Sequence, residues 1–185
     1  MDVPRSSLDF ITICCLRLLW DEIYDNWVEV AQDVGLTVTE EQILLVLWLA
    51  KASTVTEVAS TLQRDKGTIS KSIFSLERNG LVVRQTLDDR RFSEFTLTEK
   101  GEQLILELID RHIEGQGMAF AQGFLTLDEE ERTAFARTTL KLVRYVYGDS
   151  YILAIQRMKN FPSDTKALIA KLMKEPSNMV DEKEM

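Results

Sequence analysis

The chain has 185 residues, of which 45% are hydrophobic, enough apolar content for one globular domain or a domain with an extension. Its longest uninterrupted apolar run, residues 43–50, is too short to cross a bilayer, which excludes a membrane-spanning class and favours a cytoplasmic protein. The formal net charge of −8 argues against tight binding to random nucleic acid.

The first predicted helix runs from Asp9 to about Val34 and starts in a strongly apolar stretch. Arg5 precedes that stretch, as in a secretory signal, but Asp9 and Arg17 interrupt it and no small-residue cleavage site follows. We therefore expect a helix of the mature protein. Residues 10–20 are apolar on more than one face, whereas a helix on a small domain needs one apolar stripe.

Two adjacent cysteines, Cys14 and Cys15, lie on this helix. Neighbouring cysteines on one helix do not meet disulfide geometry easily, and two are too few for a structural zinc site. We interpret them as small buried apolar side chains at a helix interface. The alternative is a redox sensor, which needs a cation beside the thiol, and Arg17 is the one nearby in sequence.

The second predicted helix spans Glu40 to Lys51 and opens with the capping pattern Thr39-x-x-Gln42. The first two helices carry several large aromatic side chains. These side chains either pack in the core or line a pocket for a small aromatic effector, and the sequence leaves both interpretations open. The candidate pocket residues are Trp20, Tyr24, Trp27 and Trp48.

Residues 54–80 predict two helices joined by a tight turn. Thr54 and Glu57 form a capping box for a helix that begins at Val55 and ends near residues 63–64. Asp65 caps the next helix, which runs from about Lys66 to Arg78 and ends at the glycine signal Asn79-Gly80. Helical periodicity buries Ile69, Ile73 and Leu76 and turns outward Gly67, Thr68, Ser70, Lys71, Phe74, Ser75 and Arg78.

That outward face combines a glycine, small hydroxyl side chains and two cations. Such a surface suits close approach to base-pair edges and phosphates, although polar outer faces are also the rule for solvated helices. Residues 81–86 and 92–97 then read as the strands of a hairpin. Helix, turn, helix and hairpin follow in the order of a winged helix-turn-helix.

The hairpin tip is the run Asp88-Asp89-Arg90-Arg91, where a simple turn would more often carry Asn-Gly or Asp-Gly. A carboxylate can hold an arginine extended toward the electronegative minor groove. The alternative is a surface ion-pair cluster of little energetic value. Residues 62–101 contain eight cations and six anions, so this segment is mildly positive although the rest of the chain is strongly acidic.

The run Asp89-x-Arg91-x3-Phe95-x-Leu97-Thr98-x2-Gly101 resembles the wing signature of the MarR family of regulators. The preceding run, Leu76-Glu77-x2-Gly80-Leu81-Val82-x-Arg84, is similar to the segment before that wing, and the resemblance covers residues 39–101. It implies a DNA reader in which Asp89 positions the wing arginine. The predicted contact residues are Lys66, Gly67, Thr68, Ser70, Lys71, Ser72, Phe74, Ser75 and Arg78 on the helix and Asp89, Arg90 and Arg91 at the tip.

After the hairpin, Thr98 opens a predicted helix that continues to about Phe124. The pattern Thr126-x-x-Glu129 caps another, which ends at Gly148. Residues 149–150 and 162–164 are predicted to start two more helices. Residues 143–149 are weakly similar to the branch of that family that includes a repressor of protease production and sporulation, from which we expect extra helices that cap a dimer. The acidic residues 175–185 predict a disordered tail.

These patterns predict a mainly α, winged helix-turn-helix protein with long terminal dimerisation helices. We expect an N-terminal dimerisation helix (1–38), a DNA-binding domain (39–101) and C-terminal dimerisation helices with an extension (102–174). One chain does not cover all the apolar helix surface, so we expect a homodimer of twofold symmetry. It would bind a pseudo-palindrome in double-stranded DNA with half-sites about 10 bp apart.

The sequence carries little chemistry. His112 is the single histidine, which excludes a multi-histidine metal site, and there is no glycine-rich phosphate loop. We therefore expect no cofactor, no metal and no enzyme activity. Two function classes stay open, a DNA-binding transcriptional regulator and a winged-helix module that binds protein partners, which the acidic charge favours.

Overall fold

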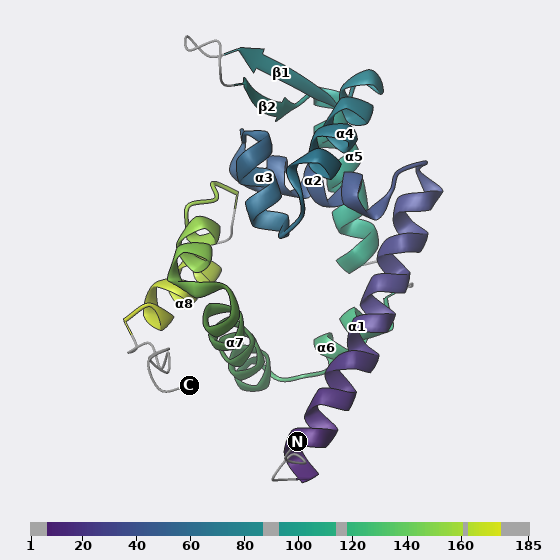
Figure 1. Cartoon of the computed structure of the whole chain (residues 1–185). Helices are drawn as coiled ribbons and strands as arrows, with labels where there is room; N and C mark the ends of the chain where they lie inside the picture. Colours follow the sequence, from purple (N-terminus) through teal and green to yellow (C-terminus); the bar gives the residue numbers. More distant parts are fainter. Residues whose placement is uncertain (1–6, 87–92, 114–117, 161–162, 175–185) are drawn as a thin grey trace.

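The computed structural model describes residues 7–86, 93–113, 118–160 and 163–174, which form mainly helices (Figure 1). This composition and order confirm the predicted mainly α, winged helix-turn-helix fold with long flanking helices. Along the chain the elements are α1 (Ser7–Asp33), α2 (Val38–Ala50), α3 (Val55–Leu62), α4 (Lys66–Arg78), β1 (Val82–Thr86), β2 (Ser93–Leu97), α5 (Glu99–Ile113), α6 (Ala119–Leu125), α7 (Glu129–Gln156) and α8 (Ser163–Leu172).

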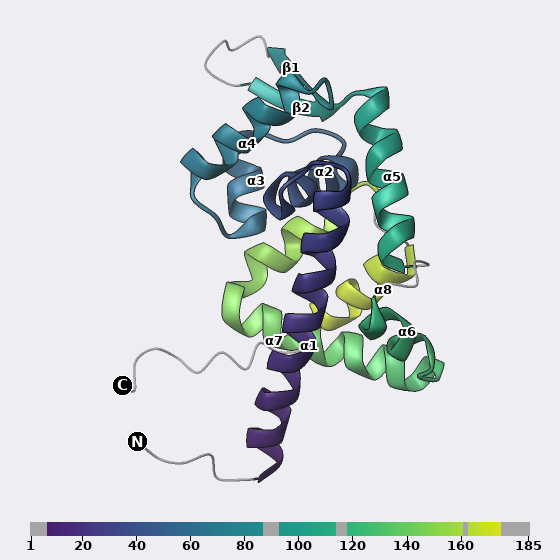
Figure 2. The ribbon, with the colours of Figure 1, turned by 90° about the vertical axis from the view of Figure 1, so that its right-hand side faces the viewer.

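The elements α2, α3, α4, β1 and β2 form one body, which we call the reader (residues 38–97). Helix α5 runs along it, while α1 and α7 extend from it on opposite sides (Figure 1). The N-terminal half of α1 projects beyond the other helices in both views (Figure 2). Within the described residues, no helix is both long enough and apolar enough to cross a membrane.

The core lies inside the reader and against the C-terminal half of α1. Ile43, Leu44 and Leu47 of α2 are fully buried at its centre. Three residues of α4, namely Ile69, Ile73 and Leu76, pack against them as their helical spacing predicts. Each such side chain contributes about 1.5–3 kcal/mol when it is fully buried.

Helix α2 begins earlier than its predicted start at Glu40, and the predicted cap at Thr39 is wrong. Thr37 is the N-cap, since its hydroxyl accepts from the Glu40 backbone while the Glu40 carboxylate accepts from the Thr37 backbone at 2.8 Å. Both Thr37-x-x-Glu40 and Thr39-x-x-Gln42 match the capping pattern. The earlier cap buries Val38 in the core, an advantage that the local pattern does not reveal.

The predicted helix-turn-helix is confirmed in its bounds and its caps. Thr54 and Glu57 form both hydrogen bonds of the capping box at the start of α3. Gln63 takes the left-handed conformation that ends α3, and Gly80, at φ 69°, ends the turn after α4. The two strands of the wing pair antiparallel, with Val82 opposite Leu97 and Arg84 opposite Phe95.

The predicted single helix from Thr98 to Phe124 is wrong. Helix α5 ends at Ile113, and α6 begins after Met118, whose backbone is extended at φ −93° and ψ 98°. Residues 114–117 contain two glycines, which lower helix propensity.

The predicted cap of the next helix at Thr126 is also wrong. The Thr126 hydroxyl donates to the Gly123 carbonyl at 2.6 Å, at the end of α6, and Asp128 instead forms a capping box with Glu131. Helix α7 is kinked at Gly148, where φ is 80° and ψ is 171°, close to the predicted helix end. Helix α8 begins at Ser163 as predicted and packs on α7.

Candidate nucleic-acid interface

The candidate interface is built on α4, and Asp65 fixes where this helix begins. The Thr68 backbone donates to Asp65 Oδ1 at 2.8 Å and the Thr68 hydroxyl donates to Asp65 Oδ2 at 2.6 Å. These bonds hold the pKa of Asp65 below its ordinary value. The hydroxyl of Thr68 is thus engaged in the cap, while its side chain stays exposed.

An exposed stripe of small and cationic side chains runs along α4 away from the core. Lys66, Gly67, Ser70 and Lys71 are exposed near its N-terminal end, and Arg78 is exposed at its C-terminal end. Within the stripe Phe74 is 59% exposed, and the Arg78 guanidinium lies 6.0 Å from the centre of its ring. An apolar ring beside cations can contact a sugar or a base while the cations meet phosphates.

Two predicted contact residues of α4 lie nearer the interior. Ser72 and Ser75 are half-buried, and Ser75 hydrogen-bonds the Glu40 side chain. Burial raises the pKa of Glu40, but the hydrogen bonds from Ser75 and Thr37 outweigh that effect and hold it below the ordinary value. Ser75 therefore joins α4 to α2 in this structure.

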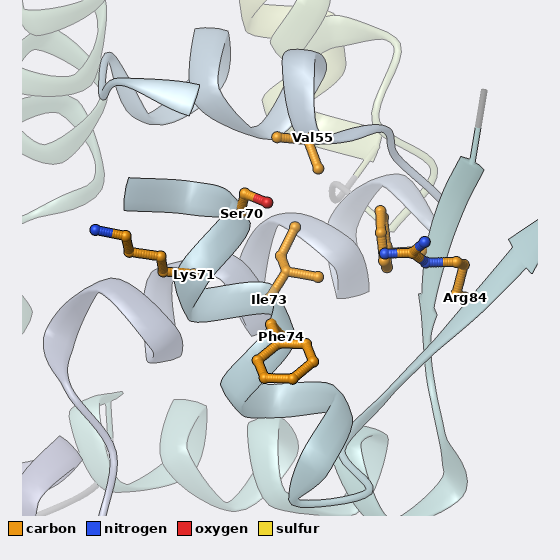
Figure 3. Close-up of a pocket in the computed structure, with 7 residues that line it drawn as sticks. Val55, Ser70, Lys71, Ile73, Phe74 and Arg84 are labelled. Atoms are coloured by element: carbon orange, nitrogen blue, oxygen red, sulfur yellow. The ribbon is translucent and has the colours of Figure 1, made fainter. Parts of the chain in front are cut away.

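Between α4 and the wing lies an open pocket of about 290 Å³ (Figure 3). Ser70 and Phe74 border it from α4, Arg84 faces it from β1, and Lys71 extends away from it. The Arg84 guanidinium lies 5.2 Å from the ring centre of Phe95, its cross-strand partner. The complete lining is Val55, Ser70, Lys71, Ile73, Phe74, Arg84 and Phe95.

Sequence reasoning missed Arg84 as an interface residue. The signal was present, because side chains two apart on a strand share a face and Val82 is buried in the core. That alternation places Arg84 on the side of the wing that faces α4. The predicted tip residues Asp89, Arg90 and Arg91 lie outside the described residues.

Hydrogen bonds from backbone and side-chain groups hold the base of the wing against the rest of the reader. Ser53 and Phe95 exchange two hydrogen bonds of 3.1 and 2.9 Å, and the Thr98 hydroxyl donates to the Gly80 carbonyl at 2.7 Å. Lys100 Nζ donates to the Asn79 carbonyl at 3.2 Å. These bonds fix the direction of β1 and β2 relative to α4.

The four aromatic candidates for an effector pocket have different surroundings. Trp20 is exposed and contacts Tyr24, with ring centres 6.0 Å apart, whereas Trp48 packs against the core. Trp27 contacts the ring of His112 at 5.6 Å. Tyr24 also lines a separate open pocket near the start of α2.

His112 joins α5 to the first two helices. Its Nε2 lies 2.5 Å from Glu41 Oε1 and its Nδ1 lies 2.9 Å from Asn26 Oδ1, both within hydrogen-bond distance. Glu41 is only 3% exposed, so this polar contact lies inside the protein. No group of three or more metal-ligating side chains occurs among the residues whose placement is described.

The cysteines are less enclosed in a single chain than the buried interpretation expects. Cys14 is half-buried and Cys15 is exposed on the projecting half of α1. Arg17, the cation nearby in sequence, is paired with Asp21 at 3.0 Å. Neither thiol is therefore buried within one chain.

Comparisons with known proteins agree with this geometry. A family model described as "Sugar-specific transcriptional regulator TrmB" matches residues 31–94. The HTH-type transcriptional regulator Hpr of Geobacillus sp. (strain WCH70) is 27% identical over 161 residues, which cover 85% of this chain and 80% of that protein.

Solved structures share the fold. AbsC, a MarR family regulator from Streptomyces coelicolor, has a TM-score of 0.68 and 18% identity over 80% of this chain and all of that one. A mutant of MarR from E. coli complexed with operator DNA has a TM-score of 0.56 and 19% identity over 70% of this chain and 90% of that one. The chain is therefore similar in sequence to helix-turn-helix transcriptional regulators and shares the fold of MarR family regulators.

Proposed function

We propose that the protein is a homodimeric repressor that places two copies of α4 in successive major grooves of a pseudo-palindromic operator. The observation that carries this proposal is the exposed stripe of α4, where small side chains flank Lys71 and Arg78 beside the wing. A helix seated in a groove needs this combination of close approach and phosphate contact. The bound dimer would then exclude RNA polymerase from the promoter.

The dimer is supported by apolar side chains that one chain leaves uncovered. Phe10 on α1 is 61% exposed and Val146 on α7 is 66% exposed. Exposed patches of this kind mark interaction surfaces. The large exposed apolar residues of α1 and α7 are Leu8, Phe10, Ile11, Ile13, Leu16, Leu18, Trp20, Tyr24, Phe135, Leu142, Tyr145, Val146, Tyr147 and Leu153.

We assign DNA contacts to the exposed side chains of α4 and to the wing. Lys66, Ser70 and Lys71 lie near the N-terminal end, where a recognition helix approaches base edges. Arg84 is added to the predicted set because it faces the space between α4 and the wing (Figure 3). Asp89, Arg90 and Arg91 remain in the proposal as the wing tip.

The test is fluorescence anisotropy with operator DNA selected from random sequence, repeated at several salt concentrations. Arg91→Ala should weaken binding and reduce the slope of log affinity against log salt by about one, because one phosphate is no longer neutralised. Lys171→Ala removes an equal charge from α8, away from α4 and the wing, and should change neither quantity. An unchanged slope in Arg91→Ala would remove the wing tip from the interface.

Release of the operator by a small aromatic effector is part of the proposal. A ligand that binds one dimer geometry more tightly would favour that geometry. The distance between the two recognition helices would then no longer match the distance between the half-sites. A second candidate trigger is peroxide, because Cys15 is exposed on α1. Cys15→Ser should keep the response to peroxide if the thiol plays no part, and should abolish it if the thiol is the sensor.

The competing class is a winged-helix module that binds proteins, which the net charge of −8 favours. The same titration separates the two classes. A regulator selects one sequence from random DNA and binds it far more tightly than unrelated DNA. Equal, weak binding to every duplex would instead support the interaction module.

A further inference from the structure

The chain continues beyond the kink in α7, and we call residues 149–174 the C-terminal extension. Gly148 makes the kink with a φ of 80°, which glycine adopts readily. Arg144 bridges it, with Nε 2.6 Å from Asp149 Oδ1 and Nη2 3.3 Å from Asp149 Oδ2. A forked arginine–carboxylate pair fixes direction as well as distance, so the extension leaves α7 at a defined angle.

Beyond the kink, the extension contacts the reader at the ends of two helices. The Tyr151 hydroxyl donates to the Thr61 carbonyl in the last turn of α3 at 3.1 Å. Asn160 donates from its backbone to the Leu49 carbonyl at 3.0 Å and from Nδ2 to the Trp48 carbonyl at 2.8 Å, in the last turn of α2. The last four carbonyls of a helix have no partner within it, so these bonds satisfy groups that are otherwise free.

Apolar side chains of the extension are also buried. Ile152 and Ile169 are fully buried and Met158 is nearly so. Burial raises the pKa of Tyr151, with a further contribution from Tyr147, which keeps the hydroxyl protonated as a donor. The described residues of the extension, 149–160 and 163–174, therefore connect the part of α7 before the kink to the reader on the side of α2 and α3 (Figure 1).

We infer that the C-terminal extension sets the distance between the two recognition helices of the dimer and thereby selects the spacing of operator half-sites, with Tyr151 and Asn160 as positioning residues. The inference rests on the proposed dimeric operator binding. In that dimer, the exposed apolar face of α7 meets the partner, while the extension ties α7 to the end of α3, which supports α4. Without these hydrogen bonds, the orientation of the reader relative to α7 would be less fixed.

The experiment uses the full chain and three kinds of duplex. These carry both selected half-sites at the selected spacing, the same half-sites moved by one or two base pairs, and one half-site alone. The variants are Tyr151→Phe and Asn160→Ala, each of which removes a hydrogen bond to the reader. Lys166→Met is the control, because it removes a hydrogen bond within the extension, to the Lys159 carbonyl at 3.2 Å, and none to the reader.

Loss of one hydrogen bond changes an equilibrium by about fivefold. We expect both variants to bind the selected spacing about fivefold more weakly, to discriminate less against shifted spacings, and to bind the single half-site like the wild-type protein. A role confined to reader stability would instead lower half-site binding by the same factor. That result, or a spacing profile identical to that of Lys166→Met, overturns the inference. Failure of the wild-type protein to prefer any operator would overturn the proposed function itself.

Discussion

At the scale of single residues, Gly101 shows why one position of the wing signature needs glycine. A β-carbon on Gly101 would overlap the Leu81 carbonyl, which accepts the Thr98 backbone N–H where the wing meets α5. The overlapping atoms belong to the backbone of Leu81, so they cannot shift without distorting the chain. Gly123 in α6 is the opposite case, because no atom lies within 4 Å of the β-carbon position.

We expect Gly101→Ala to destabilise the protein by about 1–3 kcal/mol, as overpacking does, through separation of β1 from α5. Gly123→Ala should instead stabilise it by about 0.5–1 kcal/mol, because alanine favours a helix interior. Urea denaturation measures the free energy of unfolding of both variants and of the wild type. A Gly101→Ala protein as stable as the wild type would contradict the close approach.

Glu40 supports a pH prediction at the same scale. Its folded pKa lies below the ordinary value of 4.5, so the carboxylate contributes stability above that pH and the contribution disappears as pH falls through the folded pKa. Glu40→Gln should cost on the order of 1 kcal/mol at neutral pH, as removal of a helix cap does. The difference from wild type should shrink below about pH 4 in thermal unfolding scans. A constant difference down to pH 3 would contradict the assignment.

At the scale of elements, apolar periodicity predicted the helices well and their ends less well. The bounds of α3 and α4 followed from Thr54, Asp65 and Gly80, because each of these signals stands alone in its segment. Helices α2 and α7 each offer two matching caps, and packing of the whole molecule decides between them. Attachment of Asn160 to α2 joins residues over a hundred positions apart, so local pattern gave no sign of it.

The candidate site was predictable to the same degree. The exposed face of α4 follows from three buried residues at helical spacing, and the structure places it as expected. The inward turn of Ser75 depends on Glu40 of another helix, and Arg84 needs the register of the wing as well as its sequence. The sequence thus predicts features that depend on one element, but it does not predict contacts between elements.

The position of β1 gives a prediction for the wing strand. Arg84→Gln should weaken operator binding and reduce its salt dependence, because it removes one cation beside α4 while the side chain keeps much of its length. Gln85→Ala on the next residue is the control, since Gln85 lies on the other face of the strand. Anisotropy titrations at three salt concentrations measure both. Equal effects of the two changes would exclude a specific role for Arg84.

At the scale of the whole molecule, the projecting half of α1 and the outer face of α7 present apolar side chains without a covering layer. The composition alone indicated this excess, because residues 10–20 are apolar on more than one face. The three-dimensional arrangement adds that the uncovered surfaces lie away from α4 and the wing (Figure 1). Association through them would leave both readers facing outward.

We expect Val146→Glu to convert the proposed dimer to a monomer, since a buried carboxylate without a partner is costly at an interface. Val83→Glu makes the same substitution at an exposed apolar site of β1, outside the predicted dimerisation helices, and should leave the dimer intact. Analytical ultracentrifugation gives the mass of each variant. A dimeric Val146→Glu protein would place the interface elsewhere.

The exposed N-terminal half of α1 also makes the stability of the protein depend on its concentration. If a second chain shields that end, mass action makes the melting temperature rise with protein concentration. A cell that makes few copies would hold mostly unshielded chains, which are open to proteases and aggregation. The amount of folded protein would then fall more steeply than its rate of synthesis, with a sharp threshold.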